Sequence, residues 1–269
     1  MTDKYCVIGN PIAHSKSPEI HPVFARLSGQ DLVYERCLAP LDGFADTVRR
    51  LVNEGYRGAN VTLPFKIEAA QVCTRLEQRA RAAGAVNTLS FEHGEIVGDN
   101  TDGPGLVADI TRNAGVAIAG KRVLLLGAGG AARGALLPLI GQGPREIVIA
   151  NRTVATAQGL AQDFIRYGVP IAASGFAEVP GSFDIVINAT SGSLAGAVPP
   201  VPAAVFGPGC LALDMMYGSE PTVFMDVAAG HGAVVRDGLG MLVEQAAEAF
   251  AIWRGVRPDT TEVFKKMRA

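Results

Sequence analysis

The sequence predicts an α/β protein of two domains, the second of them a doubly wound parallel sheet. First, apolar runs of strand length alternate with longer segments of helical period along most of the chain. Second, several runs in the later half are almost wholly apolar, as strands buried on both faces are. Third, 48% of the 269 residues are hydrophobic and 19% are charged, which suffices for an ordinary packed core, and the length allows one large domain or two smaller ones.

The first region contains three predicted strands, with helical segments between and after them. The strands are residues 5–9, 32–38 and 58–62, and the helices are residues 17–28, 44–54 and stretches within 66–83. Residues 85–91 and 95–98 then form a predicted hairpin that turns at His93-Gly94.

The second region begins with residues 122–126, Arg-Val-Leu-Leu-Leu, a nearly all-apolar run. Three further runs follow, at residues 146–150, 184–188 and 211–213, separated by helical segments. Such alternation implies right-handed βαβ units and a doubly wound sheet. Helices over residues 239–254 and about 260–267 end the chain.

Composition excludes several classes of partner. The chain has 24 Lys+Arg against 26 Asp+Glu, which gives no electrostatic footprint for nucleic acid or for an anionic membrane. We find no signal-peptide pattern and no apolar stretch near the ~20 residues that span a bilayer. Four cysteines lie far apart without a pairing pattern: Cys6, Cys37, Cys73 and Cys210. We therefore expect a cytoplasmic protein.

A glycine-rich turn follows the strand of residues 122–126 and precedes a predicted helix. Gly127, Gly129 and Ala132 fit the pattern G-x-G-x-x-G/A. The first glycine permits a tight turn, the second lets the backbone approach a pyrophosphate, and the small third residue lets helix and strand pack closely. We therefore predict a Rossmann-type nucleotide domain, with these residues at the cofactor: Gly127, Ala128, Gly129, Gly130 and Ala131.

The end of the next strand indicates which dinucleotide binds. An NAD site commonly has Asp or Glu there, which accepts hydrogen bonds from the ribose hydroxyls. Here the strand is followed by Asn151, Arg152 and Thr153, with no carboxylate. A guanidinium and two neutral polar side chains suit the 2′-phosphate of NADP. The sequence favours NADP, although no second cation follows at residues 154–156.

Two polar clusters carry the candidate chemistry. Asn60, Thr62 and Lys66 lie at the end of a predicted strand, where ligands bind in open α/β sheets. Residues 99–103, Asp-Asn-Thr-Asp-Gly, form the second cluster. A lysine held near a carboxylate such as Asp102 could take the proton of an alcohol while hydride leaves the same carbon.

These motifs resemble those of the shikimate dehydrogenase family over essentially the whole chain. Residues 9–18, Gly-Asn-Pro-Ile-Ala-His-Ser-Lys-Ser-Pro, resemble the family's opening motif, and residues 60–66 resemble its N-V-T-x-P-x-K motif. Residues 100–103, 188–191 and 237–242 match further motifs in order: Asn-Thr-Asp-Gly, Asn-Ala-Thr-Ser and Asp-Gly-Leu-Gly-Met-Leu.

The resemblance implies a role for each site residue. Lys66 would be the general acid/base, and Asp102 would hold the lysine and the substrate hydroxyl. The other implied substrate-binding residues are Ser15 and Ser17 at the carboxylate, Tyr217 on the same side, and Asn60, Thr62, Asn87 and Gln245 at the ring hydroxyls. Met215 and Gly238 would lie near the nicotinamide. No His, Cys or Asp spacing suggests a metal site.

The resemblance also implies that the C-terminal helices pack back on the first domain. Residues 1–101 with 238–269 would then form the substrate-binding catalytic domain, and residues 102–237 the NADP-binding domain. The expected reaction is NADP-dependent interconversion of 3-dehydroshikimate and shikimate, in aromatic amino acid biosynthesis, by a monomer or homodimer.

Two alternatives stay open from the sequence. A related enzyme of relaxed specificity would oxidise quinate or use NAD. A nucleotide-sensing protein would have kept the fold and lost the chemistry, yet Lys66 and Asp102 are both present.

Overall fold

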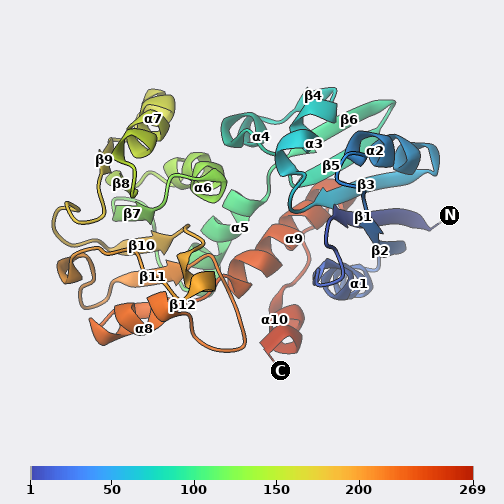
Figure 1. Ribbon diagram of the computed structural model, residues 1–269. Helices are drawn as coiled ribbons and strands as arrows, with labels where there is room; N and C mark the ends of the chain where they lie inside the picture. Colours follow the sequence, from blue (N-terminus) through green and yellow to red (C-terminus); the bar gives the residue numbers. More distant parts are fainter. Residues whose placement is uncertain (1, 269) are drawn as a thin grey trace. The chain divides into compact units, whose positions relative to one another are not determined.

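The computed structural model describes residues 2–268, and their backbone divides into two compact units. The first unit contains the residues up to Gly105 and those from Leu242 onward, and the second contains Leu106–Met241. Each unit has its own six-stranded sheet (Figure 1). The two boundaries lie close to those expected at residues 101 and 237, while the division of binding roles between the units stays a prediction.

The first unit is built on a mixed sheet with the strand order β2-β1-β3-β5-β6-β4. Strands β1, β2 and β3 are parallel, and β5 runs antiparallel to both β3 and β6. The strands are β1 (Asp3–Gly9), β2 (Leu32–Leu38), β3 (Tyr56–Val61), β4 (Arg75–Leu76), β5 (Thr88–Glu92) and β6 (Glu95–Asp99). The β5–β6 hairpin turns at His93 and Gly94, as predicted, and both have positive φ.

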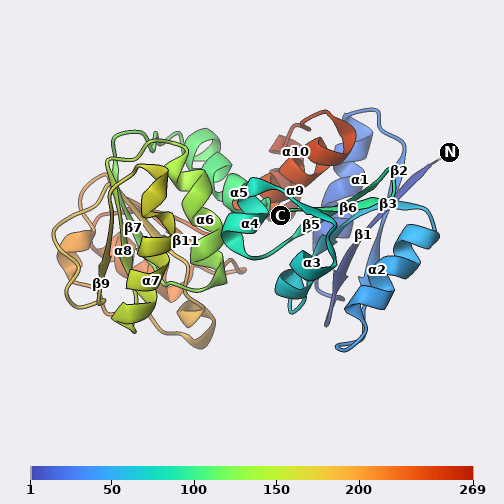
Figure 2. The same ribbon diagram turned by 90° about the horizontal axis from the view of Figure 1, so that it is seen from above.

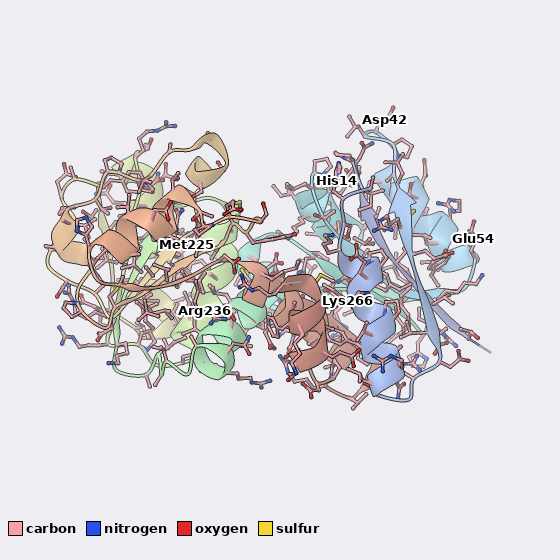
Figure 3. The ribbon with its side chains drawn as sticks, turned by 90° about the horizontal axis from the view of Figure 1, so that it is seen from below. His14, Asp42, Glu54, Met225, Arg236 and Lys266 are labelled. Atoms are coloured by element: carbon pink, nitrogen blue, oxygen red, sulfur yellow. The ribbon has the colours of Figure 1, made fainter. Side chains whose placement is uncertain are left out.

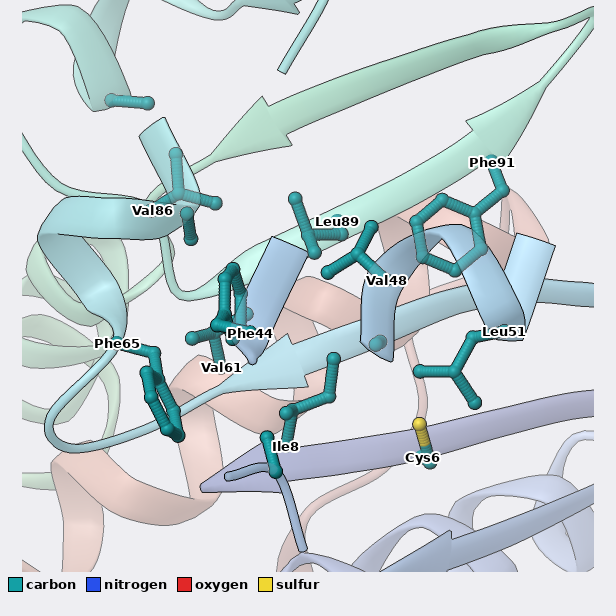
Figure 4. Close-up of a cluster of buried hydrophobic side chains, with 14 residues drawn as sticks. Cys6, Ile8, Phe44, Val48, Leu51, Val61, Phe65, Val86, Leu89 and Phe91 are labelled. Atoms are coloured by element: carbon teal, nitrogen blue, oxygen red, sulfur yellow. The ribbon is translucent and has the colours of Figure 1, made fainter. Parts of the chain in front are cut away.

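Helices cover both faces of this sheet (Figure 2). They are α1 (Ser17–Leu27), α2 (Phe44–Asn53), α3 (Lys66–Val72), α4 (Gln78–Ala83), α9 (Leu239–Arg254) and α10 (Thr261–Arg268), with α5 (Asp102–Ala108) at the boundary of the units. On one face, Phe44 of α2 and Phe65, just before α3, pack against Ile8, Val61 and Leu89 (Figure 4). On the other face, α1, α9 and α10 share a separate apolar core.

The C-terminal helices pack against the first unit, as predicted. Phe250 of α9 and Val263 of α10 are fully buried with Ile20 and Phe24 of α1. Trp253 of α9 also donates a hydrogen bond of 3.1 Å to the backbone oxygen of Leu89. These contacts explain how a residue from the end of the chain reaches side chains near its beginning.

The second unit contains an all-parallel sheet with the strand order β12-β11-β10-β7-β8-β9. Its strands are β7 (Arg122–Leu126), β8 (Glu146–Ala150), β9 (Ile171–Ser174), β10 (Ile185–Asn188), β11 (Leu211–Asp214) and β12 (Val234–Arg236), and its helices are α6 (Gly130–Ile140), α7 (Val154–Phe164) and α8 (Val223–Gly230). Helix α7 packs on β8 and β9, and α8 packs on β11 and β12. The order reverses at β7, between β8 and β10, as in a doubly wound Rossmann-type sheet.

A buried ion pair ties the two ends of the second unit together. A π-helical turn (Asp109–Asn113) follows α5, and its Asp109 side chain is fully buried. Arg236 of β12, labelled in Figure 3, donates to both carboxylate oxygens of Asp109, the shorter bond being 2.7 Å. A buried carboxylate is tolerated because it is paired and hydrogen-bonded in this way.

Three short strands were not predicted. The stretch of residues 66–83 contains β4 between two short helices, and strands β9 and β12 lie at the two opposite edges of the second sheet. All three contain four residues or fewer, too few to give a clear period of two. They form because a neighbouring strand offers backbone partners: β4 pairs with β6, β9 with β8, and β12 with β11.

Candidate active site

The two predicted catalytic side chains meet in the first unit. Lys66 begins helix α3, just after the end of strand β3, and Asp102 begins helix α5. The Nζ atom of Lys66 lies 2.6 Å from Oδ2 of Asp102, in an ion pair whose side chains are 30% and 24% exposed. A partly exposed lysine beside a carboxylate can exchange a proton with a bound alcohol while the carboxylate holds its position.

Asn87 holds the second oxygen of Asp102, and Gln245 lies beside Asn87. Asn87 donates from Nδ2 to Oδ1 of Asp102 at 2.8 Å, and its Nδ2 is 3.4 Å from Oε1 of Gln245. Gln245 belongs to α9, and its backbone lies against Gly105, where an added Cβ would come within 2.6 Å of the Gln245 nitrogen. The structure thus brings four predicted residues from distant parts of the chain to one place.

Asn60 and Thr62 extend this cluster along the end of β3. Asn60 is buried and donates to the backbone oxygen of Asn87 at 3.2 Å. Thr62 is partly buried, and its backbone nitrogen donates to Ile8 at 2.9 Å. Its methyl group lies over Gly9, where an added Cβ would come within 2.5 Å. A side chain at position 9 would therefore displace Thr62.

Ser15 and Ser17 lie at the entrance to helix α1. Ser15 is partly buried and Ser17 is buried, and the backbone N–H of Ser17 donates to Oγ of Ser15 at 3.4 Å. Arg36 fixes this loop by donating to the backbone oxygen of Ser15 at 2.8 Å. Two hydroxyls beside a helix N-terminus form a suitable site for a carboxylate.

Tyr217 differs from the other predicted substrate residues because it belongs to the second unit. It follows β11, its side chain is 43% exposed, and partial burial raises the pKa of its hydroxyl. Its predicted role at the substrate carboxylate stays a prediction.

The glycine-rich turn of the second unit has the geometry of a phosphate-binding loop. Gly127 has φ +101°, a conformation that favours glycine, and an added Cβ there would lie 3.1 Å from the methyl of Thr190. Gly129 precedes helix α6, and nothing lies within 4 Å of the position its Cβ would take. The backbone is therefore open on the side where a pyrophosphate would approach the helix N-terminus.

This turn forms one wall of a cavity of about 590 Å³. Seven predicted cofactor residues line it: Gly127, Ala128, Gly129, Gly130, Ala131, Asn151 and Arg152. Arg152 is exposed, and within residues 2–268 no acidic side chain forms an ion pair with it. A free guanidinium at the mouth of this cavity is what an adenosine 2′-phosphate requires.

The remaining predicted cofactor residues lie outside the lining of this cavity. Thr153 is exposed and accepts a hydrogen bond of 3.0 Å from Asn151 through its backbone oxygen. Met215 and Gly238 lie together, since an added Cβ at Gly238 would come within 2.2 Å of the Met215 oxygen. Only glycine allows this approach of the two backbones.

Several residues that line the cavity or support the site had no role in the sequence-based prediction. Phe176 and the segments 189–192 and 197–200 complete the cavity, and the motif at residues 188–191 was the available signal for part of it. Tyr34, Thr88 and Thr101 join the hydrogen bonds of the first unit. Within the described part of the chain, no group of His, Cys, Asp and Glu side chains could hold a metal ion. In the same part, no helix is long and apolar enough to cross a membrane.

An all-parallel nucleotide-binding sheet and a lysine–aspartate site at a strand end define a class: two-unit, dinucleotide-dependent oxidoreductases. Family models match three parts of the chain. Residues 7–89 match the shikimate dehydrogenase substrate binding domain, residues 109–195 the shikimate/quinate 5-dehydrogenase family, and residues 238–268 the shikimate 5′-dehydrogenase C-terminal domain. The chain belongs to the shikimate dehydrogenase family.

Individual relatives agree with this assignment. The chain is 61% identical to a protein named shikimate dehydrogenase (NADP(+)) from Janthinobacterium sp. (strain Marseille), over 99% of this chain and 97% of the relative. An Ael1 enzyme from Pseudomonas putida has a solved structure with a TM-score of 0.95 and 48% identity, covering 100% and 99% of the two chains. The shikimate 5-dehydrogenase of Thermus thermophilus, solved with NADP(H) and shikimate, has a TM-score of 0.85, 31% identity and 99% coverage of both chains.

Proposed function

We propose that this chain catalyses the reversible, NADP-dependent oxidation of shikimate, physiologically the reduction of 3-dehydroshikimate in aromatic amino acid biosynthesis. The single observation that carries the proposal is the 2.6 Å pairing of Lys66 with Asp102, surrounded by amide side chains suited to ring hydroxyls. The name of a relative 61% identical over nearly the whole chain supports the same reaction and the same cofactor.

In the reduction, Lys66 delivers a proton to the oxygen that becomes the alcohol, and in the oxidation it takes that proton back. Asp102 keeps the ammonium group in place through Oδ2 while Asn87 holds Oδ1. Ser15 and Ser17 bind the substrate carboxylate, and Asn60, Thr62, Asn87 and Gln245 bind ring hydroxyls. Several directional hydrogen bonds to one rigid ring fix the reacting carbon relative to Lys66.

Bound NADP supplies the redox chemistry by accepting or giving up a hydride. The glycine-rich turn offers its open backbone to the pyrophosphate, and the cavity it lines has room for a ligand. Arg152, with no carboxylate beside it at residues 151–153, binds the 2′-phosphate. The residues present therefore fit NADP.

The experiment that tests the reaction is identification of the product. Purified protein is incubated with 3-dehydroshikimate and NADPH carrying deuterium at C4 of the nicotinamide, with a matched reaction in the unlabelled cofactor. We expect shikimate that has gained one deuterium at the new alcohol carbon. Release of unlabelled shikimate with both C4 epimers of the deuterated cofactor, or no product from folded protein, would contradict the proposed hydride transfer.

A further inference from the structure

Asn60 is held by a tyrosine that the sequence assigned to no site. The hydroxyl of Tyr34, on β2, donates to Oδ1 of Asn60 at 2.6 Å. On its other side Asn60 donates from Nδ2 to the backbone oxygen of Asn87, which can only accept. These two hydrogen bonds fix the orientation of the Asn60 amide.

Thr88 continues the hydrogen bonds from Asn60 toward the catalytic pair. Its Oγ1 accepts from Nδ2 of Asn60 at 3.2 Å and donates to Oδ1 of Asn87 at 2.9 Å. The backbone N–H of Thr101 also donates to that Asn87 oxygen, at 2.8 Å. The Asn87 amide is thus oriented too, and its NH₂ group faces Asp102.

These bonds form one directed series: Tyr34 donates to Asn60, Asn60 to Thr88, Thr88 to Asn87, and Asn87 to Asp102. Thr88 is fully buried, and Tyr34 is 8% exposed. Water therefore has little access to replace a missing hydroxyl at either position. Because each group donates to one neighbour and accepts from another, losing one hydroxyl leaves a buried polar atom of the neighbouring amide without that partner and loosens the position of the amide.

The surroundings of Tyr34 keep its hydroxyl a donor. Its ring stacks on His21 with centroids 4.2 Å apart and an interplanar angle of 5°. Burial holds the pKa of Tyr34 well above its usual value, against the opposing effect of a hydrogen bond with Ser17. The phenol therefore stays protonated and can donate to the predicted hydroxyl-binding Asn60.

We propose that Tyr34 and Thr88 are positioning residues, which orient the amides of Asn60 and Asn87 for substrate binding and for holding Asp102. This rests on the proposed function, since Asn60 and Asn87 are taken as its substrate-binding groups. Neither residue touches the reacting atoms. Tyr34 acts on substrate binding through Asn60, and Thr88 acts on both amides and through Asn87 on the catalytic aspartate.

Thr88→Val tests the proposal with the least change of shape, because valine keeps the branched side chain and removes only the hydroxyl. We expect kcat for shikimate oxidation to fall about tenfold or more, since small displacements of catalytic groups are costly, while KM for NADP⁺ stays within about twofold. Thr88→Ser, which restores the hydroxyl, should recover kcat to within about threefold of the wild type. Ser90→Ala removes a buried hydroxyl two residues along the same strand, outside the series, and is the matched control.

Tyr34→Phe provides a second, independent variant that keeps the ring stacked on His21. Because Asn60 binds substrate, we expect KM for shikimate to rise about fivefold with a smaller change in kcat. If Thr88→Val does not fold, this variant alone decides. Wild-type kinetics in Thr88→Val and Tyr34→Phe would overturn the positioning role, as would equal losses in Thr88→Val and Thr88→Ser. An inactive wild type would instead refute the proposed function.

Discussion

Oδ2 of Asp102 accepts a hydrogen bond of 2.6 Å from Lys66 although the two residues lie 36 positions apart in the sequence. Lysine comes from the start of the helix after β3, and aspartate from the start of the helix after β6. Oδ1 of the same carboxylate is occupied by Asn87 at 2.8 Å. The aspartate therefore cannot turn away from the lysine without losing a second hydrogen bond.

Replacing Lys66 should abolish proton transfer and leave cofactor binding intact. We expect Lys66→Ala to lower kcat about 10²- to 10⁴-fold, the usual contribution of general acid–base catalysis. NADP⁺ binding, measured by calorimetry on the same protein, should change less than about twofold, because the nucleotide cavity is lined by residues of the second unit. Turnover close to that of the wild type would remove lysine from the mechanism.

The pair should also behave as one functional unit. Asp102→Asn keeps the shape but removes the charge beside Lys66, so we expect a slower reaction and an altered pH–rate profile. The double variant Lys66→Ala/Asp102→Asn should be about as slow as Lys66→Ala alone, because groups that act together have non-additive effects. Multiplicative losses in the double variant, with an unchanged pH profile in Asp102→Asn, would show that the two groups act separately.

Arg152 should distinguish NADP from NAD. It is the cation that lines the nucleotide cavity, and Arg152→Ala should raise KM for NADP⁺ about tenfold or more through loss of charge-assisted bonds to the 2′-phosphate. KM for NAD⁺, which lacks that phosphate, should stay within about twofold. Initial rates at varied cofactor concentration measure both values. An equal rise for the two cofactors would mean that Arg152 does not contact the 2′-phosphate.

Alanine substitutions at two glycines of the nucleotide loop should have different effects, one on cofactor binding and the other on stability. Gly129→Ala places a methyl in open space, so the free energy of unfolding should change by no more than about 1 kcal/mol while KM for NADP⁺ rises. Gly127→Ala imposes a side chain on φ +101° and should lower stability by about 1–2 kcal/mol. Gly207→Ala, in open space away from the loop, is the control in urea unfolding and kinetics. Unchanged NADP⁺ kinetics in Gly129→Ala would contradict a pyrophosphate at this turn.

His21 should make stability fall in acid. Because His21 is fully buried, its pKa is lowered from about 6.5 to about 3, so the folded protein holds it neutral. Below pH 6.5 His21 becomes protonated in the unfolded chain, whereas it stays neutral in the folded protein. The stability conferred by the neutral form is therefore present above the unfolded pKa and is lost as pH falls toward the folded one.

The matching experiment is urea unfolding of the wild type and His21→Phe at pH 7 and pH 5. Between pH 7 and pH 5 the free energy of unfolding should fall by about 2 kcal/mol more in the wild type than in His21→Phe, since one pKa unit corresponds to about 1.4 kcal/mol. His93→Asn, at an exposed hairpin position whose φ of 50° suits asparagine, is the control. Equal pH dependence in the wild type and His21→Phe would show that folding does not lower the pKa of His21.

Much of the fold could be predicted from the sequence because its strands are long or wholly apolar. The bounds of β2, β7 and β8 are those expected from the apolar runs. His21, by contrast, precedes Pro22 in a helix whose sequence does not indicate its burial, and it is fully buried in an aromatic cluster. An isolated polar residue on a helix carries no local signal of what will pack over it from α9.

The residues of the site also fall into two groups, those that the sequence indicated and those that it did not. Lys66 and Asp102 belong to motifs with a chemical purpose, so their side chains could be singled out before their 2.6 Å contact was known. Tyr34 and Thr88 look like ordinary strand residues, and their roles arise from partners on other strands. Such roles depend on sheet order and register, which one sequence does not specify.

Absorbance at 340 nm tests the central claim most directly, with shikimate and quinate each assayed against NADP⁺ and NAD⁺. We predict a dominant rate for shikimate with NADP⁺, which would establish substrate, cofactor and reaction class together. A higher rate with quinate or with NAD⁺ would contradict the assigned specificity. No rate in any of the four reactions, from folded protein that binds NADP⁺, would contradict the assignment as an enzyme.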